Sequence, residues 1–192
     1  GFVKGRRNKS IIISAHYDHL GMMGKAIFRG ANDNASGVTM ILNLAKFYSK
    51  KNPKYNMVFM AFGAEEVGIL GSKYYVENPL FPLDDIKFMI NLDLLGTGEE
   101  GITVVNGTLH KKVFKQLTTI NMQGNLLPKI KIRGRAANSD HYWFSQKGVP
   151  AFFIYTLGGI KAYHDVYDIP NTLPLTEFND LRTLLINFID NI

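Results

Sequence analysis

The distribution of apolar residues along the chain predicts short buried strands that alternate with amphipathic helices. Residues 11–15 form a short continuous apolar run, which is typical of a strand buried on both faces. Residues 36–49 carry apolar side chains along one helical stripe, with Asn34 or Ser36 able to cap the start. The other predicted elements are strands at 57–62, 86–92, 102–105, 130–132 and 149–155 and helices at 68–77, 110–122, 139–146 and 178–189.

This alternation predicts the fold class α/β, as a three-layer α/β/α sandwich around a mostly parallel central sheet. Residues 21–30 are rich in glycine and are predicted to form a loop. The chain of 192 residues contains no internal repeat, low-complexity segment or linker. We therefore expect residues 1–192 to form a single domain.

Composition narrows the possible functions. Apolar residues make up 46% of the chain, but their longest runs are far too short to span a bilayer, so no membrane span is predicted. The absence of cysteine excludes disulfides and thiolate metal sites. The net charge is +6, with a basic cluster at residues 4–9, but the other basic residues are scattered without interleaved aromatic residues. A nucleic-acid partner is therefore not expected.

Side chains of the kinds that bind metals follow four of the predicted strands. They are, in chain order, His16, Asp18, Glu65, Glu66, Asp93 and His164. In open α/β sheets, functional groups gather beyond the carboxyl ends of the parallel strands. We therefore expect these six side chains to share one rim of the sheet.

Two of the candidate positions have ordinary structural interpretations as well. On an extended segment, His16 and Asp18 point the same way, so the carboxylate can fix the imidazole tautomer; a hydrogen-bonded surface histidine is the alternative. Asp33 precedes a predicted helix and could simply cap it. However, its small neighbours let its carboxylate approach a buried centre, where its two oxygens could bridge two cations.

The adjacent acids Glu65 and Glu66 should repel one another unless cations are near. Because consecutive side chains diverge, one acid can bind metal while the other faces an attacking water; two solvated acids at a helix start are the alternative. Asp93 ends a buried strand and needs a partner, whereas His164 would otherwise be a surface histidine. Imidazole and carboxylate ligands without sulfur suit zinc, or less selectively manganese or cobalt.

These segments together resemble the M28 family of zinc peptidases, which includes aminopeptidases and carboxypeptidases. The matching segments, in the family's order, are 14–21, 32–37, 65–72, 91–93, 139–141 and 163–164. The resemblance implies two zinc ions, with Mn²⁺ or Co²⁺ as possible substitutes. It implies that one ion is held by His16 and Asp93, the other by Glu66 and His164, and that Asp33 bridges both.

The same resemblance implies the roles of the remaining residues. Glu65 is expected to be the general base, Asp18 to orient His16, and the Asp33–Asn34 peptide bond to be cis. Asp140 resembles an acid near the substrate pocket. Tyr155 begins a loop that, from its position, is expected to line that pocket.

The activity implied is that of an aminopeptidase, which hydrolyses the N-terminal bond of peptides or proteins with a metal-activated water. The resemblance favours a secreted, periplasmic or cell-surface location. Family members usually have further strands and a helix before the strand that leads to His16, where only fifteen residues precede it here. We therefore expect an N-terminally truncated catalytic domain.

Two alternatives stay open at this point. Glutaminyl cyclases use the same scaffold with a single working zinc, and the acid Asp140 fits them too, although residues 32–37 resemble the peptidase form. A non-catalytic binding domain would keep the fold without the metals. The presence of all five expected ligands and of the base argues against the second alternative.

Overall fold

The computed structural model describes all 192 residues and is built around a seven-stranded sheet in the order β1-β5-β2-β6-β9-β7-β8. The strands are β1 (Phe2–Val3), β2 (Arg7–His16), β5 (Tyr55–Phe62), β6 (Ile86–Leu92), β7 (Ile102–Val105), β8 (Ile130–Ile132) and β9 (Ala151–Thr156). Strands β5, β2, β6 and β9 are parallel neighbours, whereas β1 and β7 run antiparallel to β5 and β9. The predicted, mostly parallel sheet is confirmed.

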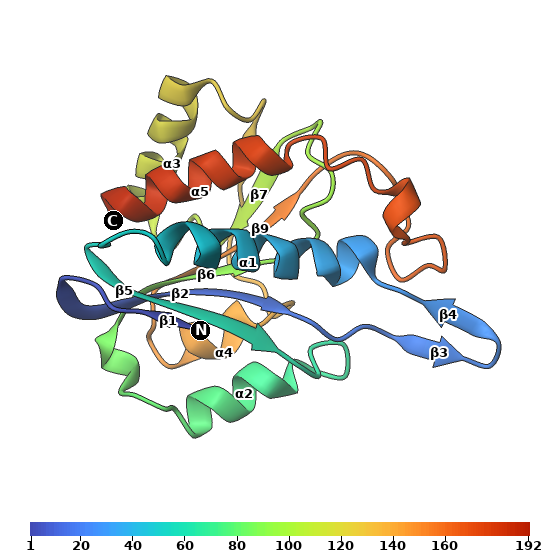
Figure 1. Cartoon of the computed structure of the whole chain (residues 1–192), viewed down its shortest axis with the longest axis horizontal. Helices are drawn as coiled ribbons and strands as arrows, with labels where there is room; N and C mark the ends of the chain where they lie inside the picture. Colours follow the sequence, from blue (N-terminus) through green and yellow to red (C-terminus); the bar gives the residue numbers. More distant parts are fainter.

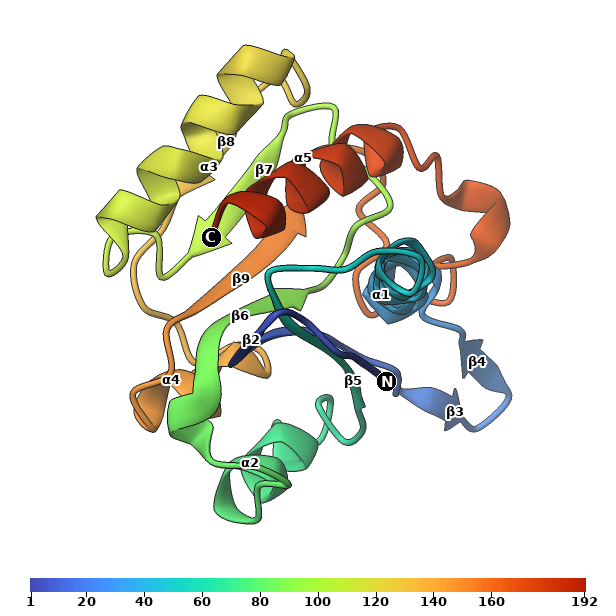
Figure 2. The same ribbon diagram turned by 60° about the vertical axis from the view of Figure 1, so that its left-hand side comes forward.

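Helices cover both faces of this sheet, which confirms the three-layer sandwich (Figure 1, Figure 2). One face carries α1 (Gly37–Tyr48), α3 (Lys111–Gly124) and α5 (Phe178–Asn191), and the other carries α2 (Leu70–Glu77) and α4 (His141–Gln146). A cluster of 26 buried residues packs beneath the first group of helices and one of nine beneath the second. Most of the core therefore lies under α1, α3 and α5. None of the helices has the length and apolarity needed to cross a lipid bilayer.

The three consecutive isoleucines in β2 are all buried because this strand lies between the two cores. Ile11 and Ile13 belong to the larger cluster, whereas Ile12 belongs to the smaller one. Successive side chains of a strand point to opposite faces, so a central strand buries every residue. All three isoleucines are at most 1% exposed.

The glycine-rich segment 21–30 corrects the sequence prediction. Instead of a plain loop, β3 (Gly21–Met23) and β4 (Ala26–Phe28) form a two-stranded antiparallel hairpin that projects from the body of the molecule (Figure 1). Met22 and Ile27 are 69% and 44% exposed, so no alternation of buried and exposed residues marks these strands. The local pairing is therefore invisible to a search for burial periodicity.

Gly37 lies where the start of α1 approaches the end of β6. A Cβ atom there would clash with Oδ1 of Asn34 and lie 2.8 Å from the carbonyl oxygen of Leu92. We expect Gly37→Ala to lower the free energy of unfolding by about 1–3 kcal/mol, as overpacking usually does, although alanine is the better helix former. Urea denaturation followed by circular dichroism measures this loss.

Leu42→Ala is the matched control for this prediction, because Leu42 lies on the same helix with 64% of its surface exposed. Its effect should stay within about 0.5 kcal/mol, as for most surface substitutions. A Gly37→Ala variant as stable as the original protein would contradict the close approach of α1 and β6.

Candidate metal centre

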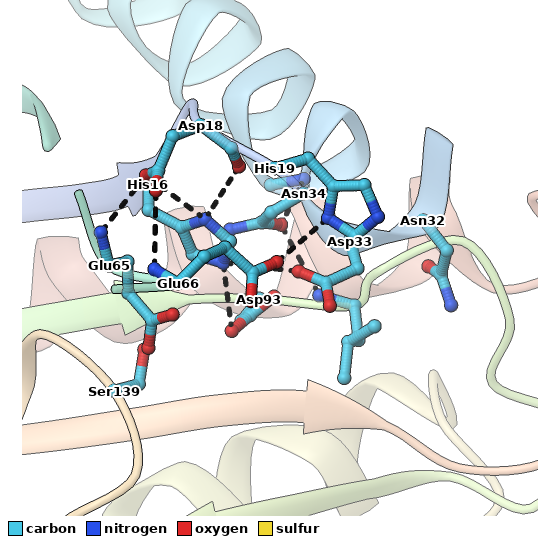
Figure 3. Close-up of polar contacts among 12 residues, drawn as sticks. His16, Asp18, His19, Asn32, Asp33, Asn34, Glu65, Glu66, Asp93 and Ser139 are labelled. Atoms are coloured by element: carbon cyan, nitrogen blue, oxygen red, sulfur yellow. Dashed lines mark hydrogen bonds and ion pairs between the residues drawn. The ribbon is translucent and has the colours of Figure 1, made fainter. Parts of the chain in front are cut away.

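The carboxyl ends of the parallel strands bring the predicted metal ligands to one rim of the sheet (Figure 3). Strand β2 ends at His16, Glu66 follows β5, Asp93 follows β6, and His164 lies in the loop after β9. The fifth predicted ligand, Asp33, reaches the same place from the segment that precedes α1. Side chains up to 148 positions apart in the sequence are therefore neighbours.

The donor atoms of these residues form two groups that share Asp33. Nε2 of His16 lies 3.2 Å from Oδ1 of Asp33 and 3.3 Å from Oδ2 of Asp93. Nε2 of His164 lies 3.3 Å from Oδ2 of Asp33 and 3.0 Å from Oε2 of Glu66. Each carboxylate oxygen of Asp33 thus belongs to a different group.

The spacing of these atoms fits metal coordination. Nitrogen and oxygen ligands of a tetrahedral zinc ion lie about 2.0–2.1 Å from the metal, which places two ligands of one ion about 3.3 Å apart. The separations within the two groups are 3.0 to 3.3 Å. In addition, Nε2 of His164 and Oδ1 of Asp93 are buried without a hydrogen-bond partner. The donor set therefore suits a cation.

The electrostatics of the rim also favour a cation. Burial raises the pKa of Glu65 to about 8, and the negative charge of Asp93 adds to this effect while His16 opposes it. Burial likewise raises the pKa of Asp93. Burial alone lowers the pKa of His16, but contacts with Asp33 and Asp93 outweigh it and raise that pKa. Burial and mutual repulsion thus disfavour the charged forms of these carboxylates, and a bound metal ion would offset both effects.

Asp18 lies beside His16 but serves mainly another part of the rim. The carbonyl oxygen of Asp18 lies 3.1 Å from Nδ1 of His16, while its carboxylate oxygen is 3.7 Å from that nitrogen. The carboxylate accepts hydrogen bonds from the backbone N–H groups of Glu65 at 3.1 Å and Glu66 at 3.2 Å. Because β2 ends at His16, the alternation rule of an extended strand does not extend to Asp18.

Asn34 ties the Asp33 segment to the end of β6. Its side-chain Nδ2 donates to the carbonyl oxygen of Leu92 at 3.0 Å, and its Oδ1 accepts from the backbone N–H of Gly37 at 3.0 Å. Of the two possible caps of α1, Asn34 therefore provides the hydrogen bond. The carboxylate of Asp33 is left for the two histidines. The Asp33–Asn34 peptide bond is cis, as expected.

Asp168 also positions Asp33, although no sequence pattern predicted this role. Its carboxylate accepts hydrogen bonds from the backbone N–H groups of Asn32 at 2.7 Å and Asp33 at 3.0 Å. Asp168 is 1% exposed and lies four residues after His164. Its hydrogen bonds therefore connect the loop that carries His164 to the segment that carries Asp33. Nothing in the polar segment after His164 distinguishes it from Asp165.

His19 is the second residue that sequence reasoning missed. Its Nδ1 lies 2.7 Å from Oε1 of Glu66, and both side chains are almost fully buried. The residue lies within the segment 14–21, but a histidine in a polar loop carries no signal of burial. It adds a third imidazole to the rim.

The two predicted substrate-binding residues lie in different surroundings. Asp140 is fully buried at the start of α4, neither carboxylate oxygen has a hydrogen-bond partner, and burial raises its pKa to about 6. Its negative charge contributes to the raised pKa of Glu65.

The hydroxyl of Tyr155 accepts a hydrogen bond from Nη1 of Arg133 at 3.2 Å. Tyr155 lines a cavity of about 220 Å³ with Tyr163, beside Asp168.

The sandwich, together with imidazole and carboxylate donors gathered beyond its parallel strands, defines a candidate metalloenzyme. A family model described as "Peptidase family M28" matches residues 2–189. The chain therefore belongs to peptidase family M28, as its motifs indicated.

Individual relatives cover parts of the chain. It is 36% identical to "Aminopeptidase YwaD" of Bacillus subtilis over 93 residues, which are 47% of this chain and 19% of that protein. It is 27% identical to the human "BOS complex subunit NCLN" over 180 residues, which are 81% of this chain and 31% of that protein. A solved zinc aminopeptidase from Bacillus subtilis superimposes with a TM-score of 0.81 at 25% identity, covering 98% of this chain and 48% of that one. The chain thus spans less than half of each of these relatives.

Proposed function

We propose that this chain is the catalytic domain of a metallo-aminopeptidase that works with two zinc ions. The observation that carries the proposal is the division of the donor atoms into two groups, with one oxygen of Asp33 in each. Two metal ions about 3.5–4 Å apart, bridged by a common ligand, form a known hydrolytic arrangement. Support for the reaction comes from the relatives named as aminopeptidases and from the solved zinc aminopeptidase.

In this proposal the two groups of donors hold one ion each. His16 and Asp93 hold the first ion, Glu66 and His164 hold the second, and Asp33 bridges them. Bound zinc supplies Lewis acidity, which lowers the pKa of a water ligand and polarises a carbonyl group. Because the donors are nitrogen and oxygen only, Mn²⁺ or Co²⁺ could replace zinc.

Glu65 moves the proton in the proposed reaction. It lies at the rim beside the ligand Glu66 but belongs to neither donor group, so its carboxylate is free to act on the substrate. Its backbone N–H donates a hydrogen bond to the carboxylate of Asp18, which restrains the backbone at Glu65. The carboxylate accepts a proton from the attacking water and then donates it to the nitrogen of the leaving amine.

The proposed substrates are the N-termini of peptides or proteins. Glu65 and Asp93 offer negative charge to an N-terminal ammonium group. The cavity of about 220 Å³ next to the His164 loop, lined by Tyr155, Gly158 and Tyr163, is suited to the first side chain. This cavity adjoins the rim, because Asn32 and Asp168 line it as well.

The experiment that tests the proposed function is hydrolysis of a panel of amino-acid anilides, before and after chelation and after zinc is restored. We expect hydrolysis that is lost with the metal and recovered with about two zinc ions per chain. A parallel assay with N-terminal glutaminyl peptides measures cyclisation. Cyclisation without hydrolysis would instead indicate a glutaminyl cyclase.

A non-catalytic binding domain is the second candidate function. The observation that favours it is the relative NCLN, whose name describes a subunit of a complex and not an enzyme. A folded chain that binds no zinc and hydrolyses no anilide would support this candidate and overturn the aminopeptidase proposal.

A further inference from the structure

We propose that His19 is a positioning residue, which holds one oxygen of Glu66 so that the other oxygen faces the metal position shared with His164. The proposal rests on the proposed two-ion function but adds a residue outside the five ligands. It predicts that His19 sets the affinity of one of the two ions and leaves the other unaffected.

The two oxygens of Glu66 have different partners. Oε1 lies 2.7 Å from Nδ1 of His19 (Figure 3). Oε2 lies 3.0 Å from Nε2 of His164. The backbone N–H of Glu66 is bound by Oδ2 of Asp18 at 3.2 Å. Glu66 is thus restrained at its backbone and at one oxygen, which leaves Oε2 as its free metal ligand.

The orientation of the His19 ring is set by packing as well as by this hydrogen bond. A Cβ atom added to Gly30 would lie 2.6 Å from Cγ of His19, so the backbone of Gly30 packs directly against the imidazole. The ring of His164 meets it edge-on, with centroids 5.8 Å apart. The side chain of His19 is 7% exposed, and Nε2 has no partner in the protein. An ionised carboxylate only accepts hydrogen bonds, so Nδ1 is the donor to Glu66.

The arrangement has a direct consequence for metal affinity. A carboxylate ligand without a partner for its second oxygen can rotate, and ordering it costs part of the binding free energy. Loss of such supporting contacts usually lowers metal affinity about 10- to 100-fold. The hydrogen bond of His19 goes to Glu66, and no hydrogen bond or ion pair joins it to His16 or Asp93, so the ion held there should keep its affinity.

A pair of nearly isosteric variants tests the proposal. His19→Asn places an amide N–H near the position of Nδ1 and keeps the donor, whereas His19→Leu has a similar shape without a donor. The affinity of each of the two zinc ions is measured by titration against a chromophoric chelator. We expect His19→Leu to weaken one ion about 10- to 100-fold and leave the other unchanged, with His19→Asn recovering most of the loss.

His110→Leu is the matched control, because His110 lies outside the rim and contacts none of the ligands. Equal weakening of both ions, no weakening, or an equal loss in the leucine and asparagine variants would overturn the positioning role. If His19→Leu fails to fold, His19→Gln replaces it, because its longer side chain displaces the amide from the Nδ1 position. Failure of the unaltered chain to bind two zinc ions would refute the proposed function separately.

Discussion

Glu65→Gln is expected to lower kcat about 10²- to 10⁴-fold while the zinc content stays unchanged. Glutamine keeps the size of the side chain but cannot accept a proton, and a positioned general base usually contributes a factor of this size. The metal should remain because all five ligands are other residues and Glu65 belongs to neither donor group. Steady-state kinetics with amino-acid anilides, together with zinc analysis of the same sample, measures both quantities.

The matched control is Glu77→Gln, since Glu77 is an exposed acid at the end of α2. This variant should keep full activity. If Glu65→Gln retained most of its activity, Glu65 would not be the base. The buried acid Asp140 would then be the next candidate, because its charge already acts on Glu65 and its own pKa is raised by burial. Loss of the remaining activity in Asp140→Asn would assign the proton transfer to it.

Asp33→Ala is expected to abolish both zinc binding and hydrolysis. Asp33 supplies one oxygen to each donor group, so its removal leaves each ion with two protein ligands, fewer than the three that catalytic zinc sites use. We expect less than about one zinc per chain after dialysis and no measurable turnover. Atomic absorption on the dialysed protein and the anilide assay check the two outcomes.

Thermal unfolding separates this effect from a loss of folding. A ligand that binds only the folded state stabilises it by about 4 kcal/mol at a concentration 1,000 times its Kd. Added zinc should therefore raise the melting temperature of the original chain and of the control Asp84→Ala, whose side chain is exposed at the opposite end of β6. It should not raise that of Asp33→Ala. Two tightly bound ions in Asp33→Ala would contradict the bridging role.

The strands and helices of this protein were largely predictable from the sequence, because burial leaves a periodic pattern. The run at Ile11 to Ile13 identified a central strand, and β6, β7 and β8 have the predicted bounds. Where the pattern was weak, the prediction was incomplete. Strand β2 begins at Arg7, four residues before its apolar run, because its first residues are exposed and polar. The hairpin of β3 and β4 gives no strand signal because its apolar residues are exposed and no alternation of buried and exposed positions marks them.

The residues that lie at the rim can be identified from the order of residues along the chain, because a residue directly after a parallel strand lies at the end of the sheet. This rule predicts that His16, Glu66 and Asp93 lie together. Family motifs added the expected roles of these residues. The local sequence thus identifies which side chains lie at the candidate metal centre, and the family resemblance indicates the reaction in which they are expected to take part.

Which atoms of these side chains meet depends on how the loops pack in the folded protein. The carboxylate of Asp168 supports the backbone of Asp33 across 135 positions of sequence, and His19 holds Glu66 across 47. These contacts come from loops, where no periodicity records burial or direction. A hydrogen bond depends on the position and orientation of both partners, and loops that are distant in sequence acquire these only when the core has packed.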